Sequence, residues 1–211
     1  MATFASILTG DGGVRSITND ADATAYRNSD ANLIGWANEA LYEIALRRPD
    51  LFSKVGAVAC VQNNTAQVIP APGIVLLDIL NVQNGNVVTK VSRQWLDQFI
   101  PSWHTDAAAS ALHWVPDITS PTRFFIYPKA PAAQSIVAIW AEISQVYVAS
   151  DPIPITGYDH AIKDYVIFRA EAVDDESVNT ARALAFYQKF DRTLGISVMV
   201  QGGTDVAKEA K

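Results

Sequence analysis

The sequence holds few of the residue types from which catalytic and metal sites are built. Its 211 residues include one cysteine, Cys60, which excludes an intrachain disulfide and a cysteine zinc cage. Cys60 stands in the apolar run 58–61 and is predicted to be a small core residue. The nucleophile motif Gly-x-Ser-x-Gly does not occur. The glycines at 10–13 lack the Lys-Ser/Thr ending of a phosphate loop, so we interpret them as a flexible leading segment. We predict no catalytic site and no cofactor.

Charge is also scarce, and its balance is acidic. Charged residues make up 18% of the chain, against about a quarter in an average soluble domain. There are 22 acidic and 16 basic residues, and the densest basic point is Arg47-Arg48, so tight binding of nucleic acid through its phosphates is not expected. An acidic protein can still surround DNA without holding it, because like charges repel. Low charge beside 49% hydrophobic residues indicates a further surface that is buried in an assembly, although a single-domain enzyme with a large core can have the same composition.

Long apolar runs are missing. None approaches the ~20 residues that a membrane-spanning helix needs, so no membrane partner is predicted. The N-terminus lacks a basic region and Asp11 interrupts its short apolar stretch, which argues against a signal peptide. We expect the protein to be made in, and at first to reside in, a reducing cytoplasm.

Apolar periodicity predicts helices at both ends of the chain. Over 30–48 apolar residues recur at spacings of three and four; Ser29 or Asp30 can cap the start, and Pro49 ends the helix. After a proline-rich link at 151–154, the same spacing returns over 161–173 and 183–194, as far as Gly195, a predicted left-handed stop. An amphipathic helix has to bury its apolar stripe, so we expect all of these helices to pack together.

The middle of the chain has the texture of a β domain. Runs 57–62 and 66–69 flank Asn63-Asn64, and runs 74–82 and 86–91 flank Asn84-Gly85, which predicts two hairpins. A short helix is expected over 93–99, and further strands over 112–115, 123–127 and 135–148. We therefore predict an α+β fold with three parts: a discontinuous helical bundle domain (1–50 plus 151–195), an inserted β-sandwich-like domain (51–150), and an extended C-terminal arm (196–211).

The arm begins with a short alternating run. A lone terminal strand has unpaired N–H and C=O groups that the sheet of another chain can accept. Docking on a partner is one interpretation; a frayed tail, or a strand added to this chain's own sheet, are the alternatives. The candidate docking residues are Ile196, Ser197, Val198, Met199 and Val200.

Aromatic and histidine residues offer the remaining candidates. Trp95, Trp103 and Trp114 cluster around loops; they are either core residues or anchors at contacts between subunits, where tryptophan is enriched. His104 and His113 lie in the same stretch, but only scattered acids could supply a third zinc ligand, so no metal site is predicted.

Four passages resemble the head-to-tail adaptor (connector) proteins of short-tailed bacteriophages. Residues 33–40, running on to 48–50, are similar to the opening helix of that family, and 67–70 with 74–77 to its passage into the β region. The aromatic strand that ends in proline is matched by 114–116 with 124–128. The final helix pair is matched from Tyr158 to Phe190. The likeness covers about residues 30 to 195.

The resemblance implies a structural virion protein without enzymatic activity. Family members assemble as a ring of twelve copies between the portal protein and the tail nozzle protein, stabilise the packaged DNA, and give the tail fibre proteins a platform. DNA passes through the lumen without specific binding. The C-terminal segment of such proteins reaches onto the portal, so the resemblance assigns portal docking to the run that begins at Ile196. It implies a place in the neck of the virion after assembly in the host cytoplasm.

Two other classes of protein remain open at this stage. One is another neck or tail-completion protein of a phage, which would differ in its binding partner. The other is an intracellular hydrolase, which would need His104 or His113 to meet a carboxylate and a nucleophile.

Overall fold

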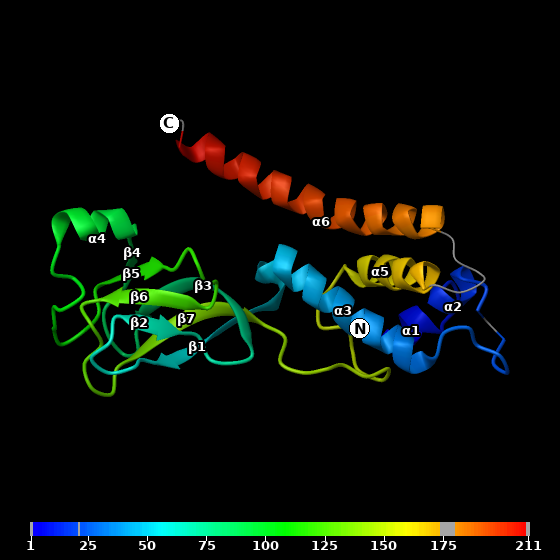
Figure 1. Cartoon of the computed structure of the whole chain (residues 1–211), viewed down its shortest axis with the longest axis horizontal. Helices are drawn as coiled ribbons and strands as arrows, with labels where there is room; N and C mark the ends of the chain where they lie inside the picture. Colours follow the sequence, from blue (N-terminus) through cyan, green and yellow to red (C-terminus); the bar gives the residue numbers. More distant parts are fainter. Residues whose placement is uncertain (1, 21, 174–179, 210–211) are drawn as a thin grey trace. The chain divides into compact units, whose positions relative to one another are not determined.

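The computed structural model describes residues 2–20, 22–173 and 180–209 and divides into two compact units (Figure 1). One is formed by 1–48 and 145–211, and its regular elements are helices; the other is formed by 49–144 and contains the β-sheets. The predicted α+β class is confirmed. Each unit is described by itself.

Over its described residues the helical unit forms α1 (Phe4–Leu8), α2 (Val14–Ile17), α3 (Asp30–Arg47), α5 (Asp159–Ala172) and α6 (Thr180–Glu209). Helix α3 confirms the predicted first helix, because the Ser29 hydroxyl accepts the amide hydrogen of Asn32 at 3.1 Å and the helix ends just before Pro49. Its apolar stripe is buried, with Leu33, Trp36, Leu41 and Ile44 all 9% exposed or less.

Helices α5 and α6 run antiparallel and are held by ion pairs as well as by aromatic packing. Lys189 reaches the buried carboxylate of Asp164 at 2.9 Å, and Arg182 lies 3.5 Å from Glu171. Phe190, next to Lys189, packs against α5 with its ring centroid 5.1 Å from that of Tyr165. Both pairs fit one antiparallel register.

The prediction that Gly195 ends the last helix and that 196–200 form a strand is wrong. Helix α6 continues without a break to Glu209, so the arm predicted as extended is helical over its described residues; 210 and 211 lie outside them. Glycine inside a helix costs about 1 kcal/mol relative to alanine, which weakens a helix without obliging it to stop. The apolar residues Ile196, Met199 and Val200 also recur at three and four, so the short run fits both periods.

The interpretation of 10–13 as a flexible leading segment is also wrong. These glycines form the turn between α1 and α2, and Gly12 adopts a φ of 67° there. Phe4 and Val14, one from each helix, are fully buried. A Cβ on Gly13 would lie 2.7 Å from the Gly10 carbonyl oxygen, so the turn is tight enough to require glycine.

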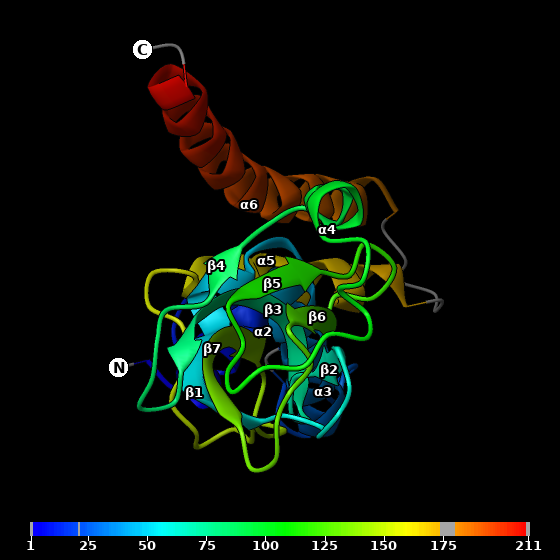
Figure 2. The same cartoon turned by 90° about the vertical axis from the view of Figure 1, so that its left-hand side faces the viewer.

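The second unit contains two sheets. One has the order β1-β7-β3, from β1 (Ser53–Ala59), β7 (Ser135–Glu142) and β3 (Gly73–Val82). The other has the order β2-β6-β5-β4, from β2 (Ala66–Val68), β6 (Arg123–Tyr127), β5 (His113–Pro116) and β4 (Thr89–Lys90). All neighbours are antiparallel except β4 and β5. A 3₁₀ turn, η1 (Pro49–Phe52), precedes β1, and helix α4 (Arg93–Phe99) follows β4 (Figure 2).

The turn of the second predicted hairpin is present, but its two runs pair only at Asn81 and Val87, before β4 joins β5 in the other sheet. Asn84 adopts a φ of 58°, and the Val82 amide donates to the Asn86 carbonyl at 2.9 Å, which closes the second turn. The first is wrong, because β1 pairs with β7 and β2 with β6. Asn63 does take a positive φ, so the local turn signal was correct while the partners of the two strands were set by contacts far along the chain. Strand β7 also ends earlier than predicted, at Glu142.

The core of the β unit draws buried side chains from both sheets. Trp140 of β7 packs with Trp114 of β5 and Phe124 of β6 in one hydrophobic cluster. Gly56 of β1 makes room for this core, since a Cβ there would come within 2.7 Å of the Trp140 ring. Trp103 and Leu96 form a second cluster beneath α4.

Candidate assembly surfaces

Neither candidate histidine belongs to a metal-binding cluster among the described residues. Within 2–20, 22–173 and 180–209, no three His, Cys, Asp or Glu side chains lie together as a metal site requires. No helix in those ranges has the length and hydropathy to cross a bilayer. His104 lies against Trp103, with ring centroids 3.6 Å apart, and His113 stacks parallel to Tyr127. His104 is exposed and has one ring neighbour among the described residues, whereas His113 contacts the rings of both Trp95 and Tyr127.

Two of the three candidate tryptophan anchors belong to the core. Trp103 and Trp114 are each 1% exposed, so their rings are not available to another subunit, and the interpretation of these two as interface anchors is wrong. Trp95 lies on the surface of α4, where its ring packs against Phe99 at 5.5 Å. The sequence alone could not distinguish the two buried tryptophans from the exposed one, because all three cluster around loops.

Helix α6 continues beyond the helix that supports it. The residue numbers of the two α5–α6 ion pairs imply that Asp159, the first residue of α5, lies opposite Leu194. Leu194 is buried, and it is the last buried residue of α6 whose side chain is described. The C-terminal half of α6, which begins at Gly195, therefore runs past the end of α5. Portal docking by Ile196 to Val200, which lie in this half, stays a prediction.

The β unit carries an apolar groove beside α4. It lies between the first turn of α4, with Ser92 and Arg93, and the end of β5, with Val115 and Pro116. One part encloses about 360 Å³ and its neighbour about 380 Å³, and they share the rim residue Ile118. Volumes of this size accept one or two large side chains of a partner.

Ile118 stands at the tip of a rigid turn. It is 98% exposed and contributes an apolar side chain to the lining of both parts of the groove. The Asp117 carboxylate accepts hydrogen bonds from the Thr119 amide at 2.8 Å and from the Thr119 hydroxyl at 2.7 Å, and it pairs with Arg123. The turn therefore presents Ile118 beside the groove in a fixed position. The Asp-x-Thr spacing is a recognisable turn signal, but nothing in the sequence places it next to a groove.

We expect the turn at Ile118 to survive mild acid. Hydrogen bonds from Thr119 and the pairing with Arg123 lower the pKa of Asp117 from 3.8 to about 2. A depressed pKa gives stability that is complete above the unfolded value and is lost as the pH falls through the folded one. The Asp117 carboxyl carbon should therefore titrate near pH 2 by NMR, and Thr119→Ala should move its pKa upward. A wild-type midpoint near 3.8 would contradict the arrangement.

The fold and these surfaces define a class of protein before any comparison. A projecting helix half and an apolar groove with a rigid exposed residue beside it are features of a part that is built into an assembly. The SU10 adaptor protein family matches residues 5–209, and the chain belongs to that family. Membership confirms the predicted structural role as a head-to-tail adaptor of bacteriophage type.

Comparisons with solved structures and with curated proteins give no further support for the role of this chain. A chain of the structure titled "Neck of empty GTA particle computed with C6 symmetry" is 17% identical over 90% of this chain and 92% of that one, with a TM-score of 0.30. Similarity at that TM-score carries no argument about this fold. No curated protein matches the chain.

Proposed function

We propose that twelve copies of this chain form a ring that docks on the portal protein and carries the tail nozzle protein below it. Membership of the adaptor family supports an assembly role, and the single observation that carries the docking proposal is that α6 runs past the end of α5. Because α5 ends opposite Leu194, it does not cover the following half of α6, and we propose that this half is available to a partner.

We place portal docking on Ile196, Ser197, Val198, Met199 and Val200. Glycine costs about 1 kcal/mol in a helix relative to alanine, and β-branched residues cost less than that but still disfavour it. The docking run has three β-branched residues and is flanked by Gly195, Gly202 and Gly203. The intrinsic helix propensity of this half of α6 is therefore low. Pairing with the edge of a portal sheet would give the same residues a strand conformation that they favour.

The charge of the chain suits a channel for DNA. Its formal net charge of −6 repels the duplex, so DNA would pass through the lumen without specific binding. In this proposal the ring stabilises the packaged DNA, gives the tail fibre proteins a platform, and belongs to the neck of the virion after assembly in the host cytoplasm. The protein is a mechanical part with no reaction to catalyse.

Electron microscopy of the full chain mixed with purified portal rings tests the proposal. We expect a second layer of twelvefold density on one end of the portal, and no such layer on tail tube protein. Binding to the tail tube protein in place of the portal would overturn the assignment and would favour a tail-completion protein.

A further inference from the structure

The rim of the groove beside α4 carries uncompensated positive charge. Asp117 is engaged by Thr119 and Arg123, while Asp97 accepts a hydrogen bond from the Trp103 indole at 2.8 Å and lies 3.6 Å from Arg93. Lys90 forms no ion pair with any of the described carboxylates; its ammonium lies 5.2 Å from the centre of the Trp114 ring. A groove with an apolar floor and a cationic rim fits apolar side chains that have carboxylates beside them.

The outer face of α3 in the helical unit has that chemistry. Tyr42 and Leu46, one helical turn apart, are 51% and 54% exposed. Glu39 precedes this pair and Glu43 lies within it. Each glutamate pairs with an arginine through Oε2 alone, Glu39 with Arg169 at 2.8 Å and Glu43 with Arg47 at 3.0 Å. The second oxygen of each carboxylate forms no hydrogen bond to the described residues.

We propose that Tyr42 and Leu46 of one copy of this chain fill the groove beside Ile118 of the next copy, with Glu39 and Glu43 facing Lys90. The occupant is a second copy because one chain carries both complementary surfaces and leaves both exposed. Tyrosine in an apolar pocket is a frequent centre of binding energy.

The contact joins two different surfaces, so it repeats from copy to copy in one direction and closes into a ring when the rotation allows. A contact that paired one surface with itself would stop at a dimer. This inference rests on the proposed ring and names the contact that holds neighbouring copies together within it.

Paired cysteines test the contact in the assembled ring. The full chain carries Gly35→Cys, at an exposed position two turns before Tyr42 on the same face of α3, and Ile118→Cys, together with Cys60→Ala. It is assembled on portal rings and treated with a bis-maleimide long enough to span two helical turns. The two single-cysteine chains, in the same background, are the matched controls. Cys60 is removed for certainty, although burial already raises the pKa of its thiol to about 11 and slows its reaction.

We expect a ladder of covalent multimers from the double variant, at most traces of dimer from either single variant, and one predominant dimer when the two single variants are mixed. Rings that form without a ladder would overturn this contact and leave the adaptor function standing. Strong dimers of the Ile118→Cys chain alone would also overturn it, since they would show a twofold contact. If the unmodified chain forms no rings on the portal, the proposed function is overturned, and this inference with it.

A single charge gives an independent readout. Tyr42→Asp should lower the yield of rings at least tenfold, while Leu184→Asp, at an equally exposed leucine of α6, should leave it unchanged. Circular dichroism of both variants checks that the helices are retained. Equal yields from the two variants would contradict the proposal.

Discussion

Removal of residues 196–211 is expected to abolish docking on the portal while the rest of the chain stays folded. The deleted part of α6 follows Leu194, which lies opposite the first residue of α5, so the ion pairs of Lys189 and Arg182 with α5 remain. Several main-chain hydrogen bonds at about 1 kcal/mol each would be lost at the portal, which corresponds to a loss of affinity of roughly a hundredfold or more.

Surface plasmon resonance on immobilised portal rings gives the affinity, and thermal unfolding gives the stability. A shorter deletion, of 201–211, is the matched control; it keeps Ile196 to Val200 and should keep docking. Alanine at 196, 198 and 200 separates conformation from chemistry, because alanine favours the helix and removes the β-branched side chains. We expect this variant to gain helix content and to dock more weakly. Full affinity of the long deletion would remove docking from this segment.

The elements that the sequence predicts best are those that local chemistry determines. Ser29 and Pro49 bracket α3, and the run before Asn84-Gly85 closes a tight turn, because a cap, a proline and a positive-φ residue act within a few positions. The partner of β1 is β7, about eighty residues away. No local signal encodes that pairing, which is why the hairpin predicted around Asn63 is wrong.

The end of α6 shows a second limit. The run from Ile196 to Val200 alternates like a strand and also fits helical spacing. The isolated glycine before it, Gly195, was interpreted as the end of the helix. The part of α6 that α5 covers ends at Leu194, because Leu194 lies opposite Asp159, the first residue of α5. This limit depends on how two distant segments pack together. The family resemblance placed the docking segment; the sequence pattern alone could not give its conformation.

The candidate surfaces were harder to foresee than the fold. Ile118 looks ordinary in the sequence, and its exposure follows from how Asp117 and Arg123 close the turn. Trp103 and Trp114 look like anchors and are core residues. Exposure depends on what packs above a residue, and a single sequence does not contain that information.

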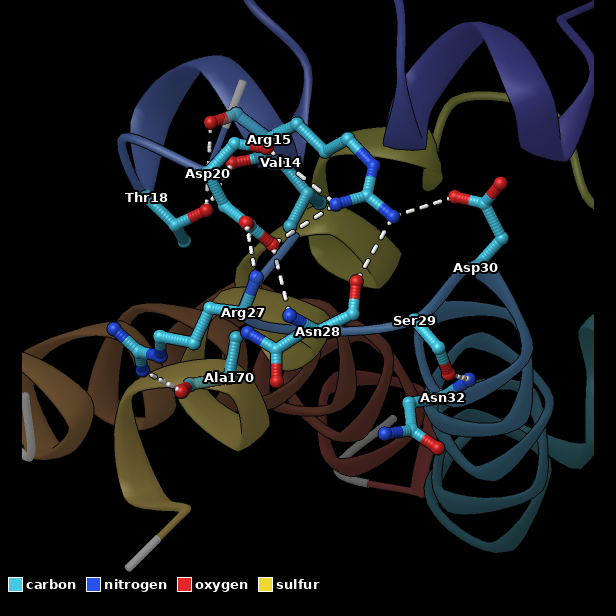
Figure 3. A network of polar contacts seen from close by, with 10 residues as sticks. All are labelled: Val14, Arg15, Thr18, Asp20, Arg27, Asn28, Ser29, Asp30, Asn32 and Ala170. Carbon is cyan, nitrogen blue, oxygen red and sulfur yellow. Dashed lines mark hydrogen bonds and ion pairs between the residues drawn. The ribbon is translucent and has the colours of Figure 1, made fainter. Parts of the chain in front are cut away.

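A buried arginine accounts for the order of the N-terminal segment, which sequence reasoning missed. Arg15, 4% exposed, donates to Asp20 at 2.9 Å, to the Asn28 carbonyl at 2.9 Å and to Asp30 at 2.5 Å (Figure 3). The Asp20 carboxylate also accepts the amide hydrogens of Arg27 at 2.7 Å and of Asn28 at 3.1 Å. One ion pair thus joins α2 to the start of α3 and fixes the loop between them.

Arg15→Ala is therefore expected to destabilise the helical unit by about 3–5 kcal/mol, because it leaves the Asp20 carboxylate buried without its countercharge. In urea, a slope of about 2 kcal/mol per molar turns this into a midpoint lower by about 2 M. Arg93→Ala is the matched control: Arg93 also pairs with an aspartate, Asp97, but both side chains are more than half exposed, so the loss should stay below about 1 kcal/mol.

The choice of probe makes this prediction specific to one unit. Four of the five tryptophans lie in the β unit, and Trp36 alone reports on the helical unit. Ellipticity at 222 nm follows the helices, so Arg15→Ala should shift the midpoint at 222 nm more than the midpoint of tryptophan fluorescence. Arg15→Met with Asp20→Asn should recover part of the loss, since it removes both charges and keeps an acceptor oxygen for one of the two amides, Arg27 or Asn28, which donate to different oxygens of Asp20. If the 222 nm midpoint of Arg15→Ala matched that of Arg93→Ala, the Asp20 carboxylate would have to be hydrated, and Arg15 would not be what orders the N-terminal segment.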